Sequence, residues 1–321
     1  EEMEQLSNGE LTEVLARGCR IFARTTPRQK LRIVTVLKDM GEIVAVTGDG
    51  VNDGPALKHA DIGIAMGITG TDVAREASQM VLLDDNFATI VAAIEEGRAV
   101  FENIRKFITY IFTSNIPEIV PYLTYVLLGI PLPLTIIQIL IIDLGTDMLP
   151  ALALGAEPAA GETMRTPPRP RGEPLLTSAM LRRAYAFLGP IEAAAAMASY
   201  FYILVQGGWS WGQTPPTLLY HQATTACLTA VIVTQIANGF VCRSPRQSVF
   251  SLGMFTNRLL LVGMLVEVGL QLAIVYSPIG QKLFGTAALP LTAWLVALPY
   301  ALFLFAADEG RKALARRLPA P

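Results

Sequence analysis

The chain has little sulfur or imidazole with which to hold a soft metal or to build a disulfide framework. Its 321 residues include three cysteines and two histidines. Cys19, Cys227 and Cys242 have no metal-ligand spacing, and two of them lie in or beside strongly apolar stretches. Internal repeats and low-complexity runs are also absent, and the net charge of −2 gives no indication of nucleic acid. We therefore expect neither a disulfide framework nor a nucleic-acid partner.

Apolar residues are abundant but unevenly distributed. The chain is 52% hydrophobic with a mean hydropathy of +0.44, which is too apolar for an ordinary soluble domain. Up to Lys106 it is normally charged, whereas beyond it six apolar stretches approach the roughly 20 residues that cross a bilayer. We place these expected spans at 107–128, 134–155, 184–205, 219–241, 259–276 and 290–307. None is at the N-terminus, so a signal peptide is not expected.

The distribution of lysine and arginine predicts the orientation of these spans. Basic residues precede the first span, fill the second and fourth connections and follow the sixth, whereas the other connections carry only Lys282. By the positive-inside rule, the N-terminal part, the even-numbered connections and the C-terminus are expected to be cytoplasmic. The Pro/Arg-rich stretch 163–174 is expected to be an extended loop. The basic residues are Arg105, Lys106, Arg165, Arg169, Arg171, Arg182, Arg183, Arg243, Arg246, Arg258, Arg311, Lys312, Arg316 and Arg317.

A polar, glycine-hinged segment, Thr47–Gly54, follows the apolar run 42–46, which we expect to be a buried strand. Asp49 and Asp53 therefore leave the end of a strand, where α/β folds place their chemistry. Two carboxylates repel an unaccompanied phosphate and become useful when a hard cation such as Mg²⁺ lies between protein and phosphoryl oxygens. The segment thus indicates a magnesium and phosphoryl site. A dinucleotide-binding glycine loop is disfavoured because acids would occupy its cradle, and an ordinary polar turn is the other alternative.

Three carboxylates interrupt the first two expected spans. Glu118 lies in the first span, and Asp143 and Asp147 lie in the second. Each ionised carboxylate at mid-bilayer is disfavoured by at least about 3 kcal/mol, so the group requires compensation, which a bound cation would supply. Glu118 is four residues after Ser114, so we expect these two side chains to share a helix face. The same spacing predicts that Asp143 and Asp147 share one.

Two residues near these carboxylates weaken helical hydrogen bonding. Pro117 has no N–H and Gly145 loosens the second span, so backbone carbonyl oxygens are expected to join the carboxylates around an ion. An all-oxygen site suits Na⁺, K⁺, Ca²⁺ or H⁺. Polar groups that merely hydrogen-bond between helices are the alternative. For Glu192 and Glu267, single carboxylates in later spans, both interpretations are left open.

In combination, these motifs resemble the cation-transporting P-type ATPases of type II. The resemblance covers about residues 21–317, and its membrane motifs look most like those of sodium–potassium pumps, with calcium pumps similar too. It implies that residues 1–86 are the C-terminal part of a cytoplasmic phosphorylation domain with a haloacid-dehalogenase-like α/β fold. It also implies a helical stalk at 87–106, and at 107–321 a bundle of six transmembrane helices with a short cytoplasmic tail. The motifs are Thr47–Asp53, Ala60–Met66, Ser114–Glu118 and Asp143–Asp147.

The resemblance also implies roles for individual residues. Asp49 would bind Mg²⁺, Asn52 and Asp53 would support the phosphate site, and Lys30 would contact the phosphoryl group. The implied ligands of the transported cation are Ser114, Asn115, Glu118, Asp143, Thr146 and Asp147. An additional ion site is implied at Tyr110, Thr113, Gln235, Asn238 and Glu267. There, Asn238 departs from the sodium–potassium pumps and Gln235 from the calcium pumps, so neither ion assignment transfers cleanly.

The activity implied is ATP-driven transport of Na⁺/K⁺ or Ca²⁺ through an aspartyl-phosphate cycle, with Mg²⁺ as cofactor, in a multi-pass protein of the plasma membrane. The family's Asp-Lys-Thr-Gly motif, nucleotide-binding domain, actuator motif and first four spans are missing from the sequence. We therefore expect an inactive C-terminal fragment that requires the N-terminal half of the pump. A phospholipid flippase of the same superfamily, a membrane-anchored phosphohydrolase and a non-enzymatic interaction protein are alternatives, but none accounts for both motif sets.

One long helix is expected between these two sites. From Phe87 to Ile116 only Gly97 interrupts the helical pattern, and residues 84–86 offer capping side chains. Thirty helical residues extend about 45 Å. Such a rod could carry movement from the phosphate site to Asn115 and Glu118.

Overall fold

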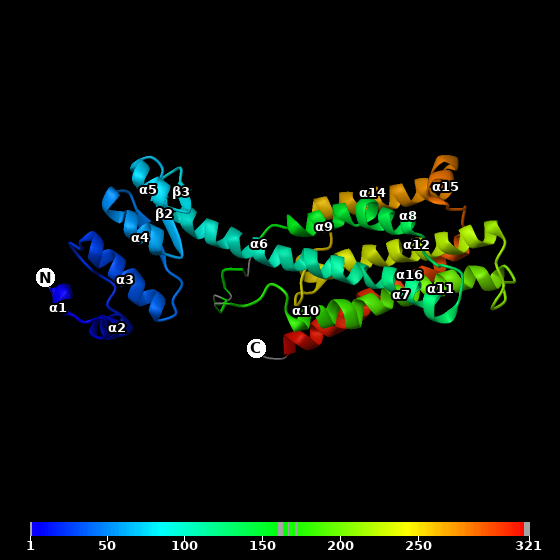
Figure 1. Ribbon diagram of the computed structural model, residues 1–321, viewed down its shortest axis with the longest axis horizontal. Coiled ribbons are helices and arrows are strands. Elements are labelled where there is room, and N and C mark those ends of the chain that lie inside the picture. Colours follow the sequence, from blue (N-terminus) through cyan, green and yellow to red (C-terminus); the bar gives the residue numbers. More distant parts are fainter. Residues whose placement is uncertain (1, 160–162, 166, 168, 171, 318–321) are drawn as a thin grey trace. The chain divides into compact units, whose positions relative to one another are not determined.

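The computed structural model describes residues 2–159, 163–165, 167, 169–170 and 172–317 (Figure 1). It divides into an N-terminal unit of residues 1–97 with 164–173, and a helical unit of residues 98–163 with 174–321. Arg171, one of the basic residues used to predict orientation, lies outside the described residues, as does the end of the expected tail, 318–321.

The N-terminal unit contains a three-stranded parallel sheet. Its strands, in the order β1-β2-β3, are β1 (Ala45–Gly48), β2 (Ile62–Met66) and β3 (Met80–Leu82). Ala45 lies opposite Ile62, and Ile64 lies opposite Met80. Helices α4 (Gly54–His59) and α5 (Asp72–Ala77) supply the crossovers that parallel pairing requires. Parallel strands joined by helices are present, but the expected α/β fold of the haloacid-dehalogenase type stays a prediction.

The first strand differs from the one expected at 42–46. It begins at Ala45 and ends at Gly48, and it is largely exposed, as is Ile43 before it, whose exposed fraction is 57%. The expectation of a buried strand was wrong because, within the described residues, β1 pairs only with β2 and forms an edge of the sheet. The central strand β2 carries the buried side chains instead.

Three helices precede the sheet: α1 (Glu2–Gln5), α2 (Asn8–Ala16) and α3 (Pro27–Asp39). A capping box starts α3, in which the Gln29 N–H donates to Thr26 Oγ1 at 3.3 Å and the Thr26 N–H donates to Gln29 Oε1 at 2.8 Å. Pro27 fits the first helical turn, where its missing N–H costs no hydrogen bond. Val34 then packs against Val44 and α4, which fixes α3 beside the sheet.

The loops after β2 and β3 are fastened by Asp85, which has a left-handed φ of 50°. Its carboxylate accepts the N–H groups of Gly67 at 2.6 Å, Ile68 at 3.0 Å and Thr69 at 2.8 Å. Of the expected capping residues at 84–86, Asn86 does cap the next helix by accepting the Ala88 N–H at 3.0 Å. The carboxylate of Asp85 is used instead to join the two loops.

The helical unit consists of α-helices interrupted by two π-helical turns. Its helices are α6 (Phe87–Ser114, which begins in the N-terminal unit), α7 (Ile116–Leu128), α8 (Ile136–Ile141), α9 (Met148–Gly155), α10 (Ser178–Arg183), α11 (Gly189–Gln206), α12 (Thr217–Cys242), α13 (Val249–Leu252), α14 (Arg258–Tyr276), α15 (Pro278–Phe284) and α16 (Leu291–Arg317). The π turns are Ile142–Thr146, between α8 and α9, and Ala184–Leu188, between α10 and α11. The long helix expected at 87–116 is confirmed as α6, which ends at Ser114.

Within the described residues, five segments are long and apolar enough to cross a membrane: Ile136–Gly155, Ser178–Gln206, Thr217–Cys242, Arg258–Tyr276 and Leu291–Arg317. They correspond to the second to sixth expected spans, so a membrane-embedded, multi-pass helical region is confirmed. The first expected span, 107–128, is divided at Asn115 between charged α6 and α7, which has only 13 residues. Its crossing of the membrane is therefore kept as a proposal.

Helix α12 forms the centre of the helical unit. Of the most apolar 18-residue stretch of α12, 83% is buried inside the structure, compared with 28% for the corresponding stretch of α16. Apolar residues of α11, α12 and α14 share a buried core that includes Tyr200, Cys227 and Ile274. Gly189 at the start of α11 lets α7 approach, because a Cβ there would lie 2.6 Å from Ile116 Cγ1. The many exposed apolar side chains of the outer helices suit contact with lipid.

Candidate functional site

The glycine-hinged segment after β1 holds Asp53 against the end of the strand. Asp53 closes a 3₁₀ turn, Val51–Asp53, and its side chain is buried. A Cβ at position 48 would lie 2.4 Å from Asp53 Cβ, so only glycine permits this approach. The Asp53 N–H donates to the Gly50 carbonyl at 3.0 Å, which closes the turn.

Lys30 reaches this turn from the first part of α3. Its Nζ lies 2.5 Å from Asp53 Oδ1, and the Gly50 N–H donates to Asp53 Oδ2 at 3.3 Å. Burial by itself raises the pKa of Asp53, but the hydrogen bonds from Lys30 and Gly50 outweigh burial and leave the pKa below its usual value of 3.8. The structure thus joins two of the implied catalytic residues, 23 positions apart, as an ion pair.

Asp49 and Asn52 lie on the same turn with exposed side chains. The Asp49 carbonyl accepts the Thr71 N–H at 2.8 Å, which ties the turn to the start of α5 and leaves the carboxylate accessible. Mg²⁺ is usually held by one or two carboxylates together with phosphate oxygens and water. Asp49 fits that role, because Asp53 is already neutralised by Lys30. No group of three His, Cys, Asp or Glu among the described residues could hold a metal unaided.

The second group of implied residues centres on Asp147, which is 1% exposed. Ser114 Oγ donates to Asp147 Oδ2, and the Tyr110 hydroxyl donates to Oδ1 at 3.3 Å. Both donors are themselves buried and lie on the last turns of α6. The family resemblance implies an additional ion site that includes Tyr110, and the structure places its hydroxyl beside that of Ser114 on the Asp147 carboxylate.

The backbone around Asp147 departs from α-helical geometry. The Asp147 N–H donates to the Ile142 carbonyl at 2.8 Å, five residues back, and Thr146 Oγ1 donates to the same carbonyl at 3.1 Å. This π turn includes Gly145, so the loosening expected there is confirmed. Pro150 has no N–H for the helical hydrogen bond to the Thr146 carbonyl.

The facing segment is interrupted in the same way. Helix α6 ends at Ser114 and α7 begins at Ile116, with Asn115 half-buried at the junction. Pro117 cannot donate to the carbonyl of Thr113, four residues back, and Pro121 cannot donate to that of Pro117. Both segments that contain the implied ligands therefore carry carbonyl oxygens without their helical donors.

The other two carboxylates are less enclosed than Asp147. Asp143 is exposed, so the expected sharing of one face by Asp143 and Asp147 does not give them the same environment. The π turn between them changes the angular spacing from that of an α-helix. Glu118 is half-buried, and its Oε1 has no hydrogen-bond partner in the described part of the chain. Its role, like that of Asp143, stays a prediction.

The remaining implied residues lie on α12 and α14. Asn238 Nδ2 donates to Gln235 Oε1 at 3.5 Å, and Cys242 Sγ donates to Asn238 Oδ1 at 3.1 Å. Glu267 is 1% exposed, and both of its carboxylate oxygens lack hydrogen-bond partners among the described residues. The same holds for Glu192 on α11, which is fully buried. Thr113 instead donates within α6, to the Thr109 carbonyl at 2.8 Å.

Sequence reasoning missed two buried ion networks at the ends of the spans. Glu157 accepts from Arg243 at 2.6 and 2.7 Å, with Lys106 at 3.6 Å. Asp308 is fully buried among Arg183, Arg311 and Lys312, the last of which is also fully buried. In the sequence, the basic residues of these networks predict only the orientation of the spans. The adjacent acids Asp308 and Glu309, three and four residues before basic ones, were the available clue.

Comparison with known proteins identifies a family and several relatives of the chain. Residues 131–314 match the family described as "Cation transporting ATPase, C-terminus". The chain is 41% identical over 346 residues to sodium/potassium-transporting ATPase subunit alpha-2 of Gallus gallus, which covers 99% of this chain and 34% of that protein. Identity to subunit alpha of Drosophila melanogaster is 42%, covering 99% of this chain and 33% of that protein. For subunit alpha-4 of Homo sapiens it is 41%, with coverages of 99% and 34%. The chain thus spans about a third of the length of the curated relatives it matches.

Proposed function

The chain belongs to the cation-transporting ATPase family, and from that membership we propose that it supplies the cation site of an ATP-driven membrane pump. The observation that carries the proposal is the buried carboxylate of Asp147, held by Ser114 and Tyr110 where two apolar segments lose helical hydrogen bonding. A carboxylate in an apolar helical region is costly and is usually retained for function. A cation at this point would offset that cost.

The donor set favours a monovalent cation. Ser114 and Tyr110 keep their hydroxyl hydrogens on Asp147 and still present oxygen lone pairs. Backbone carbonyls, including that of Thr146, add neutral oxygens. Within the described residues, Asp147 is the one carboxylate that both hydroxyls contact, and it balances one positive charge, whereas Ca²⁺ sites commonly use several carboxylates. We therefore propose Na⁺ and K⁺ as the transported ions, in line with the names of the relatives, and Ca²⁺ as the alternative to be tested.

The second part of the proposal concerns the turn that carries Asp49. We propose that Asp49 holds Mg²⁺, which when bound would neutralise phosphoryl oxygens, and that Lys30 lies within reach of the same phosphoryl group. Asn52 and Asp53 would shape the turn. The ion pair between Lys30 and Asp53 supports this, because it keeps the lysine ammonium at the turn while Asp49 stays accessible. The nucleotide, the phosphorylated aspartate and the rest of the cycle would come from the longer pump.

We propose the orientation that the basic residues predict, with the N-terminal unit and the C-terminus on the cytoplasmic side of the plasma membrane and residues 107–128 as a sixth span. Arg182, Arg246 and Arg258 would then all lie on the cytoplasmic side, at the ends of α10, α12 and α14. Helix α6 contributes Tyr110 and Ser114 to the cation site and begins in the N-terminal unit. We propose that it couples phosphorylation to ion binding.

Neutralising Asp147 tests the cation site. In the full-length pump, Asp147→Asn is expected to abolish cation-stimulated ATP hydrolysis, because the only enclosed negative charge in contact with Ser114 and Tyr110 is lost. The measurement is ATPase activity titrated separately with Na⁺, K⁺ and Ca²⁺. Asp72→Asn, which changes a side chain 91% exposed on α5, is the matched control and should keep wild-type activity.

The outcomes separate the competing functions. Stimulation of the wild type by Na⁺ and K⁺ supports the proposed ions, and stimulation by Ca²⁺ alone replaces them. Stimulation by a phospholipid but by no cation would indicate a flippase. A fully active Asp147→Asn variant of a pump indifferent to all three cations would refute the cation site.

Asp49→Asn tests the phosphate site separately. The variant is expected to need a several-fold higher Mg²⁺ concentration for phosphoenzyme formation, and its turnover should fall sharply, because an amide is a weaker ligand for a hard cation than a carboxylate. Phosphoenzyme formation from labelled ATP is measured against Mg²⁺ concentration. An unchanged magnesium dependence would remove Asp49 from the mechanism.

A further inference from the structure

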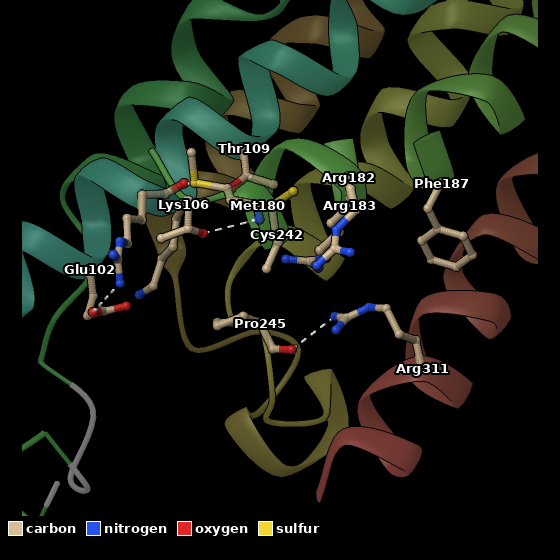
Figure 2. A pocket seen from close by; sticks show the side chains of 13 residues that line it. Glu102, Lys106, Thr109, Met180, Arg182, Arg183, Phe187, Cys242, Pro245 and Arg311 are labelled. Carbon is tan, nitrogen blue, oxygen red and sulfur yellow. Dashed lines mark hydrogen bonds and ion pairs between the residues drawn. The ribbon is translucent and has the colours of Figure 1, made fainter. Parts of the chain in front are cut away.

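A cavity of about 420 Å³ lies in the helical unit, and Tyr110, Ser114 and Asp147 are not among its lining residues (Figure 2). It is bordered by α6, by α10 and the π turn that follows it, by the end of α12, and by α16. The lining residues are Glu102, Arg105, Lys106, Thr109, Thr177, Ala179, Met180, Arg182, Arg183, Phe187, Cys242, Pro245 and Arg311. The transport function proposed above uses none of these side chains.

The lining is strongly basic. Five of its side chains are lysine or arginine, and Glu102 is the only carboxylate among the lining residues. Three further carboxylates, Glu157, Asp308 and Glu309, pair with these cations or with Arg243 and Lys312 behind them. The five lining cations, together with Arg243 and Lys312, make seven positive charges. Glu102 and the three further carboxylates make four negative charges. Among these residues, the surroundings of the cavity therefore keep a surplus of positive charge after the ion pairs named above are included.

Two of the arginines are already held in place. Arg183 donates to Asp308 at 2.9 and 3.1 Å and to the Val241 carbonyl at 2.9 Å. Arg311 donates to Asp308 at 2.7 Å and to the Pro245 carbonyl at 2.9 Å, a bond visible in Figure 2. A fixed guanidinium loses little side-chain entropy when it binds an anion. The cavity wall is thus organised before any ligand arrives.

Arg182, unlike Arg183 and Arg311, is not held by other side chains or carbonyls of the described residues. It lies beside Arg183 in Figure 2, its side chain is exposed, and no hydrogen bond or ion pair to it occurs within the described residues. Arginine presents a planar set of donors that matches phosphate oxygens. Arg182 therefore offers the cavity an uncommitted phosphate-binding group next to the organised wall.

The position of the cavity identifies the kind of ligand. Segment Ser178–Gln206 begins there, while Thr217–Cys242 and Leu291–Arg317 end near it, so the cavity lies at one end of three candidate spans. Met180, Phe187 and Cys242 give it an apolar part; in Figure 2, Phe187 is on the side away from Glu102. A basic part and an apolar part at the end of membrane helices suit an amphiphile.

We propose that this cavity is a specific binding site for an anionic phospholipid, with its headgroup phosphate at Arg182 and Arg311 and the start of an acyl chain against Phe187. Basic pockets between helices at a membrane surface are suited to anionic headgroups. A soluble phosphate ester has the same charged group but makes no use of the apolar part. The two ligand sources are therefore distinguishable by experiment.

The test is lipid binding to the purified full-length protein, measured by native mass spectrometry in detergent with phosphatidylglycerol and, as the uncharged comparison, phosphatidylcholine. Arg182→Gln is expected to weaken phosphatidylglycerol binding about fivefold, the factor that corresponds to about 1 kcal/mol per basic residue. Ala179→Trp, which fills the cavity from the exposed first turn of α10 without changing charge, should abolish the bound lipid. Arg258→Gln, which removes an exposed arginine at the start of α14 outside the cavity, is the matched control and should change nothing.

Selective loss in both cavity variants, with phosphatidylcholine binding unaffected, supports the proposal. An equal effect of Arg182→Gln and Arg258→Gln would show general surface attraction and overturn it. Displacement of phosphatidylglycerol by millimolar glycerol 3-phosphate would assign the cavity to a soluble phosphate ester and overturn the lipid assignment. Because binding is read without ATP hydrolysis, these results do not depend on which ion is transported. A folded Ala179→Trp protein that still binds the lipid would also refute the proposal.

Discussion

Asp308 is expected to be a major determinant of the stability of the helical unit. It is fully buried and is contacted by three cations: Arg183 at 2.9 Å, Arg311 at 2.7 Å and Lys312 at 3.3 Å. Asp308→Asn keeps the shape of the side chain and one carbonyl acceptor but removes the charge. Within the described residues, Lys312, also fully buried, then keeps only Glu309 at 3.0 Å as an anionic partner.

The expected cost follows from that uncompensated charge. Breaking a buried ion pair by removing one partner costs about 3–5 kcal/mol, and for a unit of this size 1 kcal/mol lowers Tm by about 2–4 °C. We expect Asp308→Asn to lower Tm by roughly 10 °C. Thermal unfolding in detergent can be followed by tryptophan fluorescence, because Trp209, Trp211 and Trp294 all lie in the helical unit.

Two further variants make the reasoning refutable. Glu102→Gln removes a 3.8 Å pair with Arg105 in which Glu102 is 43% exposed, so it should cost less than about 1 kcal/mol. Adding Lys312→Met to Asp308→Asn should restore part of the lost stability, because it removes a buried charge. An Asp308→Asn variant no less stable than Glu102→Gln, or a double variant in which the two losses simply add, would show that the buried charge does not dominate.

Two more predictions concern the turn after β1. Gly48→Ala should destabilise this turn by roughly 1–3 kcal/mol, because its Cβ would lie 2.4 Å from Asp53 Cβ. In the control Gly50→Ala, whose nearest contact would be 3.8 Å, hydrogen exchange of residues 45–53 should be almost unchanged, and equal acceleration in both variants would contradict the clash. The pKa of Asp53 lies below its unfolded value of 3.8, so its stabilisation is complete above about pH 5 and is lost as the pH falls through the folded pKa. Exchange of the same segment should therefore accelerate on acidification more in the wild type than in Asp53→Asn, and parallel pH profiles would contradict the ion pair.

The sequence determined those features that depend on neighbouring residues. Runs of apolar residues are local, and five of the six expected spans are present as helices, with ends within about six residues of the prediction except at the last, where α16 continues to Arg317 beyond the expected 307. Prolines and glycines act on their own backbone, so the disturbed helices at Pro117 and Gly145 followed from their chemistry. The position of Asp49 at the end of a strand was also readable, since glycine and acid residues directly follow an apolar run.

Tertiary structure decided how distant residues share an environment. Asp147 is joined to Ser114 and Tyr110, which are 33 and 37 positions away, and no local pattern encodes the packing of α6 against the π turn. Exposure of β1 depends on which strands lie beside it, and its own residues do not reveal that. The basic residues were alike in sequence, yet Lys312 is fully buried against Asp308 while Lys282 is exposed. A charge is visible in a sequence, but the dielectric around it and the groups that neutralise it are set only when the helices pack together.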